Sequence, residues 1–387
     1  METRPERPPR TDPARWRDVH ELLCVRLDTI GDVVMSGPAM RALAGRARIT
    51  LLTSPAGAAI AELMPEVDGS IAYAAPWMKN AGLDTGAADA DRGGTGDREM
   101  VQQLRARHFD AAVIFTVYSQ SALPAALLCL LAGIPLRLAH SRENPYALLT
   151  DWVPEHEPDR LVRHEVRRQL DLVAAVGARP PSEELRLVVP VGARERAARI
   201  LAHSGMGGES WIAVHAGGTA PARRYPPELL ATACRMLARE HRLNLVFTGD
   251  ASDRPVVEEV RARVGGSTVS LAGQLDLPEL AAVLKSARVL VSGNTGPVHI
   301  AAAVGTPVVD LYALTNPQHT PWQVPSAVLF QDVPCRWCYS SVCPEGHHRC
   351  LRGVRPEEVA RAALGLLEGD RGTRLEAPLP LEPSASG

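Results

Sequence analysis

The sequence predicts an α/β fold of two domains, each built on a parallel β-sheet that helices cover. Short apolar runs alternate with amphipathic stretches along most of the 387 residues, which is the pattern of successive β-α-β units. Within residues 177–190, the segment Ala-Arg-Pro-Pro-Ser at 178–182 reads as a linker that divides the chain almost evenly. Each half is long enough to bury a hydrophobic core of its own.

The expected strands are short apolar runs bounded by turn residues. They are Leu22–Arg26, Ile49–Thr53, Ser70–Ala74, Ala111–Phe115, Trp211–His215, Leu243–Thr248, Thr268–Leu271, Val289–Ser292 and Val308–Tyr312. Residues 1–19, 83–98 and 369–387 lack this pattern, and we expect them to be disordered or mobile.

The composition bears on the class of function. The formal net charge is −2, so nothing suggests a nucleic-acid binder. Residues 1–19 lack the apolar core of a signal peptide, and no apolar run reaches the ~18 residues of a membrane-spanning helix. We expect a cytoplasmic protein, with peripheral contact at the inner face of the cytoplasmic membrane as a further option.

The segment Val291–Pro307 is the most informative part of the chain. An apolar strand runs into Ser-Gly-Asn-Thr-Gly, and a helix of small residues follows until Gly305 stops it. Thr295 is placed to cap this helix, and His299 adds a titratable donor one turn inside. The free N–H groups of such a helix start favour an anion, typically a phosphate. The alternative is a strand–turn–helix joint that binds nothing.

A second joint of this kind lies near the beginning of the chain, in Leu22–Leu43. Its turn contains Gly31 but lacks the G-x-G-x-x-G pattern, which disfavours a dinucleotide held in the Rossmann manner. Asp32 instead places a carboxylate at the helix start, beyond the carboxyl end of the strand, where open α/β sheets bind ligands. An ordinary helix-capping role for Asp32 is equally consistent with this position.

Together the two segments resemble glycosyltransferase family 9, the bacterial ADP-heptose:lipopolysaccharide heptosyltransferases. The first carries the R-x-D-x-I-G-D-x-x-x-x-x-P pattern at residues 26–38. The second matches D-T-G-x-x-H-x-A-A-A-x-G-x-P at residues 294–307, except that Asn294 stands where the family usually has Asp. Between them, His215–Thr219, Arg223–Pro226 and Gly249–Asp253 resemble the nucleotide-binding loops of the family, and the resemblance spans Glu21–Leu367.

The resemblance implies a GT-B fold, in which two Rossmann-like domains face each other across a cleft. Residues 20–180 would form the acceptor domain and residues 181–368 the nucleotide-sugar domain, with disordered tails at 1–19 and 369–387. The last helix, near Pro356–Leu367, would cross back onto the first domain as it does in many GT-B enzymes.

The implied activity is inverting, metal-independent transfer of a heptose or related sugar from an ADP-sugar to a hydroxyl of a glycan or glycolipid acceptor. The inner core of lipopolysaccharide is the acceptor that the family suggests, while a natural product or another envelope glycan stays open. A GT-B sugar-nucleotide epimerase and a non-catalytic metal or redox module are the alternative functions. No cofactor is required for the implied reaction.

The resemblance also places the donor-binding residues. They are Gly31, Gly218, Thr219, Arg223, Arg224, Asp253, Asn294, Thr295, Gly296 and His299. Arg223 or Arg224 would bind the phosphates, unless both only decorate a helix entry. Asp253 would accept hydrogen bonds from a ribose or cap a helix, with Asp250 as competitor for either role. Asn294 would position phosphate-facing backbone.

The general base is expected in the first domain, and Asp32 is the candidate. Asp28 is the second choice. Arg26 precedes both and could instead hold Asp32 in a structural ion pair.

The remaining distinctive feature is a Cys-rich segment at residues 335–350. Cys335, Cys338, Cys343 and Cys350 have the spacing C-x2-C-x4-C-x6-C, which leaves a structural zinc site, reduced thiols or disulfides open. We expect these residues to affect stability rather than chemistry.

Overall fold

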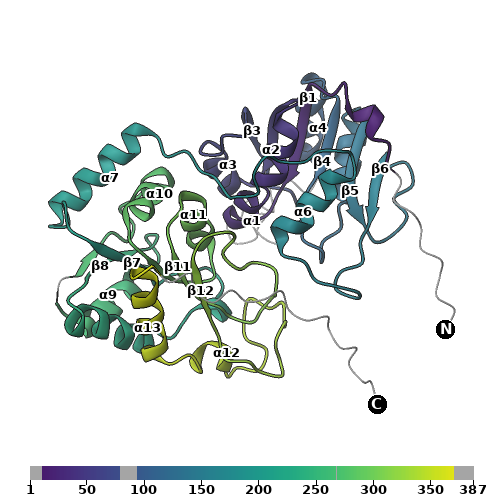
Figure 1. Cartoon of the computed structure of the whole chain (residues 1–387). Helices are drawn as coiled ribbons and strands as arrows, with labels where there is room; N and C mark the ends of the chain where they lie inside the picture. The colour runs from purple at the N-terminus through teal and green to yellow at the C-terminus, as the bar shows by residue number, and fades with distance from the viewer. Residues whose placement is uncertain (1–10, 79–93, 267, 370–387) are drawn as a thin grey trace, which may run out of the picture. The chain divides into compact units, whose positions relative to one another are not determined.

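The protein folds into two compact units, each with its own parallel sheet. The computed structural model describes residues 11–78, 94–266 and 268–369. The first unit ends at Glu183 and the second begins at Glu184, close to the boundary expected at residue 180. Each unit contains a six-stranded sheet whose neighbouring strands all pair in parallel, as the alternating pattern predicted (Figure 1).

The first sheet has the strand order β3-β2-β1-β4-β5-β6. Its strands are β1 (Glu21–Arg26), β2 (Arg48–Thr53), β3 (Gly69–Ala72), β4 (Ala111–Ile114), β5 (Leu136–Ser141) and β6 (Asp151–Pro154). The order reverses between β1 and β4, so the loops after these two strands diverge. A ligand-binding crevice in an open α/β sheet forms at such a point, outside the carboxyl ends of the strands.

The helices of the first unit cover both faces of this sheet. They are α1 (Ile30–Met35), α2 (Gly37–Ala44), α3 (Pro55–Ala61), α4 (Thr95–Ala106), α5 (Leu123–Leu131) and α6 (Glu165–Ala174). Helices α4 and α5 pack on the face that carries Leu23 and Val25. Helices α2 and α6 contact each other and lie in front of the sheet in Figure 1.

The second sheet repeats this arrangement with the order β12-β11-β10-β7-β8-β9. Its strands are β7 (Trp211–His215), β8 (Asn244–Thr248), β9 (Thr268–Ser270), β10 (Leu290–Gly293), β11 (Val308–Leu311) and β12 (Ser326–Leu329). Here the order reverses between β7 and β10. The loops after β7 and β10 are two of the segments that the sequence assigned to donor binding.

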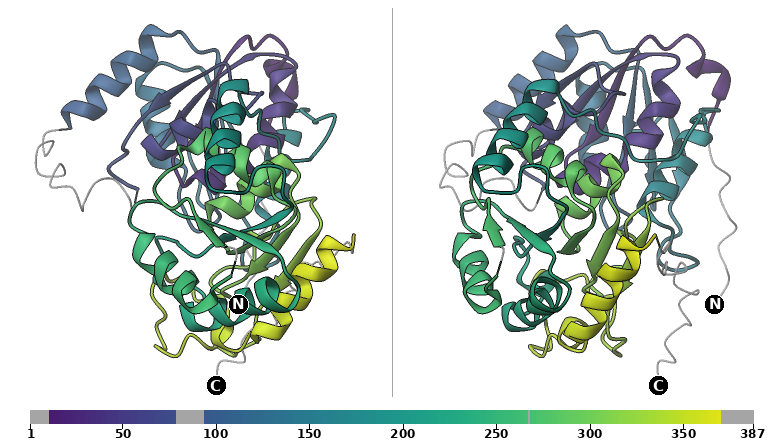
Figure 2. Two further views of the ribbon diagram at one scale, coloured as in Figure 1. Left: turned by 90° about the vertical axis from the view of Figure 1, so that its left-hand side faces the viewer. Right: turned by 60° about the vertical axis from the view of Figure 1, so that its left-hand side comes forward.

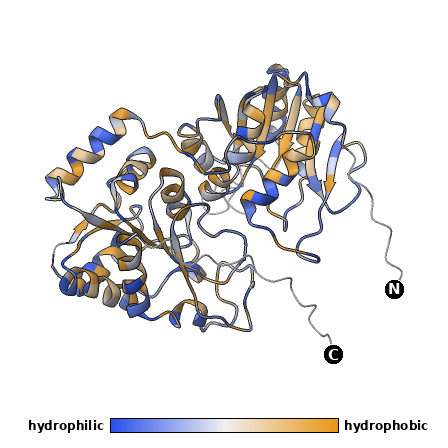
Figure 3. Ribbon diagram, viewed as in Figure 1, coloured by the Kyte–Doolittle hydropathy of each residue, from blue (hydrophilic) through white to orange (hydrophobic). Residues whose placement is uncertain are grey.

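The helices of the second unit are mostly amphipathic. They are α7 (Val191–His203), α8 (Pro227–Arg235), α9 (Arg254–Val264), α10 (Leu277–Ser286), α11 (Gly296–Val304), α12 (Arg349–Arg352) and α13 (Pro356–Leu367). Figure 3 shows hydrophilic and hydrophobic bands alternating along α7, whose buried residues Ala193, Ala197 and Leu201 recur at every fourth position.

Helix α13 corrects one expectation from the sequence. It belongs to the second unit, where it packs against α8, β11 and β12 instead of crossing back onto the first domain. Its apolar residues Val359, Ala360 and Ala363 are part of the core of that unit, and Figure 2 shows the helix in yellow beside this sheet.

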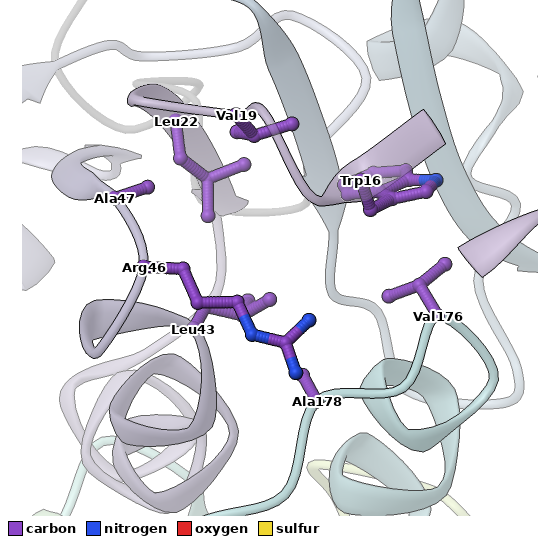
Figure 4. Close-up of a pocket in the computed structure, with 8 residues that line it drawn as sticks. All are labelled: Trp16, Val19, Leu22, Leu43, Arg46, Ala47, Val176 and Ala178. Carbon is purple, nitrogen blue, oxygen red and sulfur yellow. The ribbon is translucent and has the colours of Figure 1, made fainter. Parts of the chain in front are cut away.

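The amino-terminal segment is also more ordered than expected. Within the described part of residues 1–19, Pro13–Trp16 form a short 3₁₀ helix, and the Trp16 side chain is only 3% exposed. Figure 4 shows Trp16 and Val19 lining a small pocket together with Leu43 and Val176. Burial of these apolar side chains opposes disorder of the segment. Residues 79–93 and 370–387, which include most of the other stretches expected to be mobile, lie outside the described residues.

The sequence missed strands β5, β6 and β12. Strand β5 contains Arg137 and His140, and β6 begins at Asp151, yet all three side chains are buried. In β5 and β6, polar residues hid the apolar signal, because their buried side chains find hydrogen-bond partners outside the strand. Asp151 Oδ1, for example, accepts a hydrogen bond at 2.9 Å from the N–H of Asp12, 139 residues earlier in the chain.

Candidate functional site

The carboxyl edge of the first sheet is organised around Arg26, the last residue of β1. Its guanidinium is completely buried and contacts three carboxylates. Nε lies 2.8 Å from Asp28 Oδ2, Nη2 lies 3.1 Å from Asp32 Oδ1, and Nη1 lies 2.7 Å from Glu165 Oε1. Burial would lower the pKa of Arg26, but these carboxylates, Asp28 foremost, raise it above its usual range. Arg26 is therefore a permanent cation around which the acidic side chains are arranged.

Asp32 is held in a fixed orientation at this edge. It is the third residue of α1 and is 8% exposed. The backbone N–H of Thr29 donates to Asp32 Oδ2 at 3.2 Å, and the Thr29 hydroxyl donates to the same oxygen at 2.7 Å. The ion pair with Arg26 and the contact at the helix start are thus both present, and together they fix the position of the carboxylate. Gly31 lies beside it as the second residue of α1.

Asp28 joins the two loops that diverge where the strand order reverses. Gln120, from the loop after β4, donates through Nε2 to Asp28 Oδ1 at 2.5 Å. Burial and the nearby Asp32 carboxylate together raise the pKa of Asp28 to about 6, although the charge of Arg26 and the Gln120 hydrogen bond lower it.

The sequence analysis missed Glu165 and Gln169 in this cluster. Both side chains are fully buried on α6, and the amide of Gln169 donates to Glu165 Oε1 at 2.6 Å and to the carbonyl of Thr116 at 2.9 Å. Glu165 lies 139 residues beyond Arg26, so no local spacing could have linked them. An acidic residue in the first turn of an amphipathic helix usually reads as a contributor to the helix dipole.

The carboxyl edge of the second sheet carries the other predicted site. Helix α11 begins at Gly296, and Thr295 stands at its N-cap position. The Thr295 hydroxyl does not cap the helix, because it donates backwards to the carbonyl of Gly293 at 3.2 Å. This contact corrects the expected capping role and leaves the first N–H groups of α11 without that partner. Gly305 ends the helix in the left-handed conformation (φ 85°), as predicted.

The loops after β7 and β8 are tied together by Asp253. Its Oδ1 accepts a hydrogen bond from the N–H of Gly218 at 3.4 Å, and its Oδ2 accepts one from the N–H of Asp250 at 3.1 Å. Gly217 lies so close that a Cβ there would be 2.0 Å from Asp253 Oδ2. Asp253 precedes α9 but makes no side-chain cap, so its observed contacts join the loops. A ribose contact for Asp253 stays a prediction.

Two adjacent arginines have different surroundings. Arg224 Nε donates to the carbonyl of Gly218 at 2.6 Å. Among the residues that the structure describes, the Arg223 side chain has no ion-pair or hydrogen-bond partner. Its carbonyl oxygen lies 2.7 Å from where a Cβ on Gly293 would be, so the Arg223 turn packs directly on the end of β10. Of the two cations, Arg223 is the one left available to a ligand next to α11. Thr219 lies on the same loop and is exposed.

Asn294 and His299 complete the turn between β10 and α11. The Asn294 amide donates through Nδ2 to Asp310 Oδ2 at 2.8 Å and to the carbonyl of His319 at 2.7 Å. His299 is buried in α11, and its ring meets that of His319 edge-on with centroids 6.4 Å apart. The Asn294, Thr295, Gly296 and His299 predicted from the sequence therefore do share one site, while Asp310 and His319 were missed.

The Cys-rich segment contacts the loop that precedes Arg223. The N–H of Ala222 donates to the carbonyl of Ser341 at 2.9 Å, one residue before Arg223. All seven cysteines of the chain are free thiols, and Cys335 Sγ is 3.7 Å from His347 Nε2. Within the described ranges, no three His, Cys, Asp or Glu side chains are arranged to hold a metal ion. The structural zinc site that the cysteine spacing allowed therefore stays a prediction.

Comparison with known proteins identifies the family to which this architecture belongs. The model of glycosyltransferase family 9 (heptosyltransferase) matches residues 98–348. Lipopolysaccharide heptosyltransferase 2 of Escherichia coli K12 is 25% identical over 367 residues, which cover 90% of this chain and 98% of that protein. Lipooligosaccharide heptosyltransferase 2 of Haemophilus influenzae is 36% identical over 105 residues, but the match covers only 26% of this chain and 30% of that protein.

The solved structures show the class of fold. The crystal structure of a family 9 glycosyl transferase from Veillonella parvula superimposes with a TM-score of 0.75 at 20% identity, covering 91% of this chain and 98% of that one. The fold is therefore that of the GT-B glycosyltransferases. Since the family model matches more than half of the residues, the chain belongs to glycosyltransferase family 9.

The raised pKa of Asp28 predicts how stability depends on pH. An aspartate whose pKa is higher in the folded state stabilises the fold below its unfolded value of 3.8, and this contribution is lost as the pH rises through about 6. Between pH 5 and pH 7.5, the free energy of unfolding of the wild type should fall by about 1 kcal/mol relative to that of Asp28→Asn, whose side chain cannot ionise. Urea unfolding of both proteins at several pH values measures this difference, and a constant difference would contradict the assignment.

Proposed function

We propose that the protein is an inverting, metal-independent glycosyltransferase that moves a heptose or a closely related sugar from an ADP-sugar to a hydroxyl of a glycan acceptor. The acceptor that we favour is the inner core of lipopolysaccharide. The observation that carries the proposal is Arg223, whose side chain has no partner among the described residues. It lies beside the turn that leads into α11, at the edge of the sheet where α/β proteins bind ligands. Membership of the family and a fixed carboxylate at the matching edge of the first sheet support it.

The second unit would hold the donor through its diphosphate. The N–H groups at the start of α11 and the guanidinium of Arg223 offer positive charge from neighbouring turns, and Arg223 cannot lose its proton. These groups would stabilise the negative charge that ADP gains as the glycosidic bond breaks. Because fixed donors and a guanidinium carry this charge, the reaction needs no divalent metal.

The first unit would supply the base. The acceptor oxygen attacks the anomeric carbon from the side opposite to the departing ADP, which inverts the configuration in a single displacement. The Asp32 carboxylate accepts the proton from that oxygen and later returns it to solvent. Its contacts to Arg26 and Thr29 fix the position of the carboxylate and so lower the cost of orienting it.

Turnover should depend on Asp32. Asp32→Ala should lower kcat by ~10²-fold or more with little change in ADP affinity, because a base acts in the transition state and not in donor binding. The measurement is ADP release from ADP-heptose, and from ADP-glucose as the matched donor, with and without a lipopolysaccharide-core acceptor.

The same assay tests the rest of the proposal. Activity should persist in EDTA and should need an acceptor. Release of ADP that requires magnesium or manganese would contradict the metal-independent mechanism. Near-normal turnover of Asp32→Ala would transfer the role of base to Asp28.

Substitution of Arg223 should weaken ADP binding more than substitution of Arg224. Arg223→Ala should weaken ADP binding by about 10- to 100-fold, which corresponds to one buried charge-assisted contact. Arg224→Ala should have a smaller effect, because its guanidinium is already bonded to Gly218. Isothermal titration with ADP measures both, and unchanged affinity in both variants would remove this pair from the phosphate site.

We also propose peripheral contact of the first unit with the inner face of the cytoplasmic membrane, which would bring the protein to a glycolipid acceptor. No helix within the described ranges has the length and apolar character needed to span a bilayer. Helix α5 nevertheless exposes Leu127, Leu130 and Leu131 to between 37% and 51%, on one helical face. Arg105 of α4 donates to the carbonyl of Leu131 at 2.6 Å, which sets a cation at the edge of this face. Leucines beside a cation fit the surface of an anionic bilayer.

Membrane binding should depend on this face of α5. Leu127→Ser with Leu131→Ser should reduce cosedimentation with vesicles containing phosphatidylglycerol by about tenfold, since two apolar side chains would no longer enter the bilayer. Val188→Ser with Val191→Ser is the matched control, because these valines are similarly exposed in the second unit. Equal loss in both variants, or none in either, would rule out α5 as the contact.

A further inference from the structure

Asp310 is an acidic side chain that the donor-site chemistry does not use. It lies in β11 and is completely buried. Its Oδ2 accepts the hydrogen bond from Asn294, whereas its Oδ1 has no hydrogen-bond partner among the described residues. Burial raises the pKa of Asp310 to about 8, and the Asn294 amide and the charge of Arg223 lower it only in part. A buried carboxyl group with one hydrogen-bond partner is costly, so the position of Asp310 next to the turn between β10 and α11 calls for an explanation.

The amide of Asn294 makes two contacts that an aspartate could not make. Its Nδ2 donates to Asp310 and to the carbonyl of His319, and an ionised carboxylate has no hydrogen to donate. An aspartate at position 294 would also face the Asp310 carboxylate, and two carboxylates sharing one site cannot both stay ionised without cost. Asn294 is therefore more than a neutral substitute for the aspartate that the family pattern has at this position.

We propose that Asp310 is a positioning residue for the donor, because it orients Asn294 and through it the turn that presents α11 and Arg223. The turn of this chain thus pairs an amide at residue 294 with a carboxylate on β11. The inference rests on the proposed function, in which this turn holds the diphosphate of the donor.

The contacts show how the orientation of Asn294 reaches both anion-binding groups. Gly293, which precedes Asn294, packs against the carbonyl of Arg223. Its own carbonyl accepts a hydrogen bond from the hydroxyl of Thr295. Gly296, two residues after Asn294, begins α11. A shift of the Asn294 side chain would therefore move the helix start and the Arg223 turn together.

Exchange of the two side chains tests the proposal, with ADP titration as the readout. Asp310→Ala removes the acceptor, and Asn294→Asp removes both donors and opposes two carboxylates, so each should weaken ADP binding by about tenfold or more. Asp310→Asn keeps an acceptor and should stay within about threefold of the wild type. The double variant N294D/D310N restores an amide–carboxylate pair, so its ADP affinity should also return to within about threefold of the wild-type value. If the alanine variant does not fold, Asp310→Val replaces it, since valine suits a buried strand.

A destabilised control separates positioning from stability. Thr306→Val removes a buried hydrogen bond to the carbonyl of Leu284 just before β11, at the opposite end of that strand. It should lower the unfolding temperature without changing ADP affinity. Wild-type affinity in Asp310→Ala, or a double variant as weak as Asn294→Asp, would overturn the role of Asp310. A wild-type protein that binds no ADP would instead overturn the proposed function.

Discussion

A buried guanidinium must be paired, and this constraint shapes the first unit. Arg26 has no access to water, so its charge has to be met by side chains. Asp28 lies in the loop that follows Arg26, and Asp32 lies at the start of α1. Glu165 lies in α6, 139 residues further along the chain. The ion cluster therefore joins β1, the start of α1 and α6. The carboxylate assigned to catalysis is one arm of this structural assembly, which is why its orientation is so well defined.

The second unit gathers positively charged groups, where the first unit gathers carboxylates. Backbone N–H groups and an arginine, instead of carboxylates, gather at the carboxyl edge of the sheet. Asp253 and the Cys-rich segment, through Ser341, brace the loops on which these groups lie. The Cys-rich segment thus contacts the loop that carries Arg223, which the sequence analysis did not anticipate. Each unit places its candidate functional groups where the order of its strands reverses, and each uses long-range contacts to hold them.

The local joints of the fold could be predicted from the sequence because each is encoded within a few residues. An apolar run, a turn glycine and a helix of small residues sufficed to locate Asp32 and the Asn294–Gly296 turn. Glu165, Gln169 and Asp310 could not be found in this way, because each meets its partner only through the topology of the sheet. Strand β6 was missed for the same reason, since Asp151 is polar by sequence and meets the N–H of Asp12 only through the fold. Strand β5 was missed because Arg137 is polar by sequence, although its buried side chain bonds carbonyls in the adjoining loops. The predicted position of helix α13 on the first domain was wrong, because it rested on the resemblance to other GT-B enzymes. The apolar face of the helix packs instead in the core of the second unit.

The pairing of Asn294 with Asp310 constrains how sequences in this lineage can change. Two arrangements, each with one amide and one carboxylate, are separated by two single substitutions. The route through two acidic side chains buries them side by side, so that at least one must keep its proton, whereas the route through two amides does not. The exchanged arrangement is therefore reachable from this chain by one order of substitution and not the other. The identity of residue 310 consequently determines which changes at residue 294 natural selection can accept.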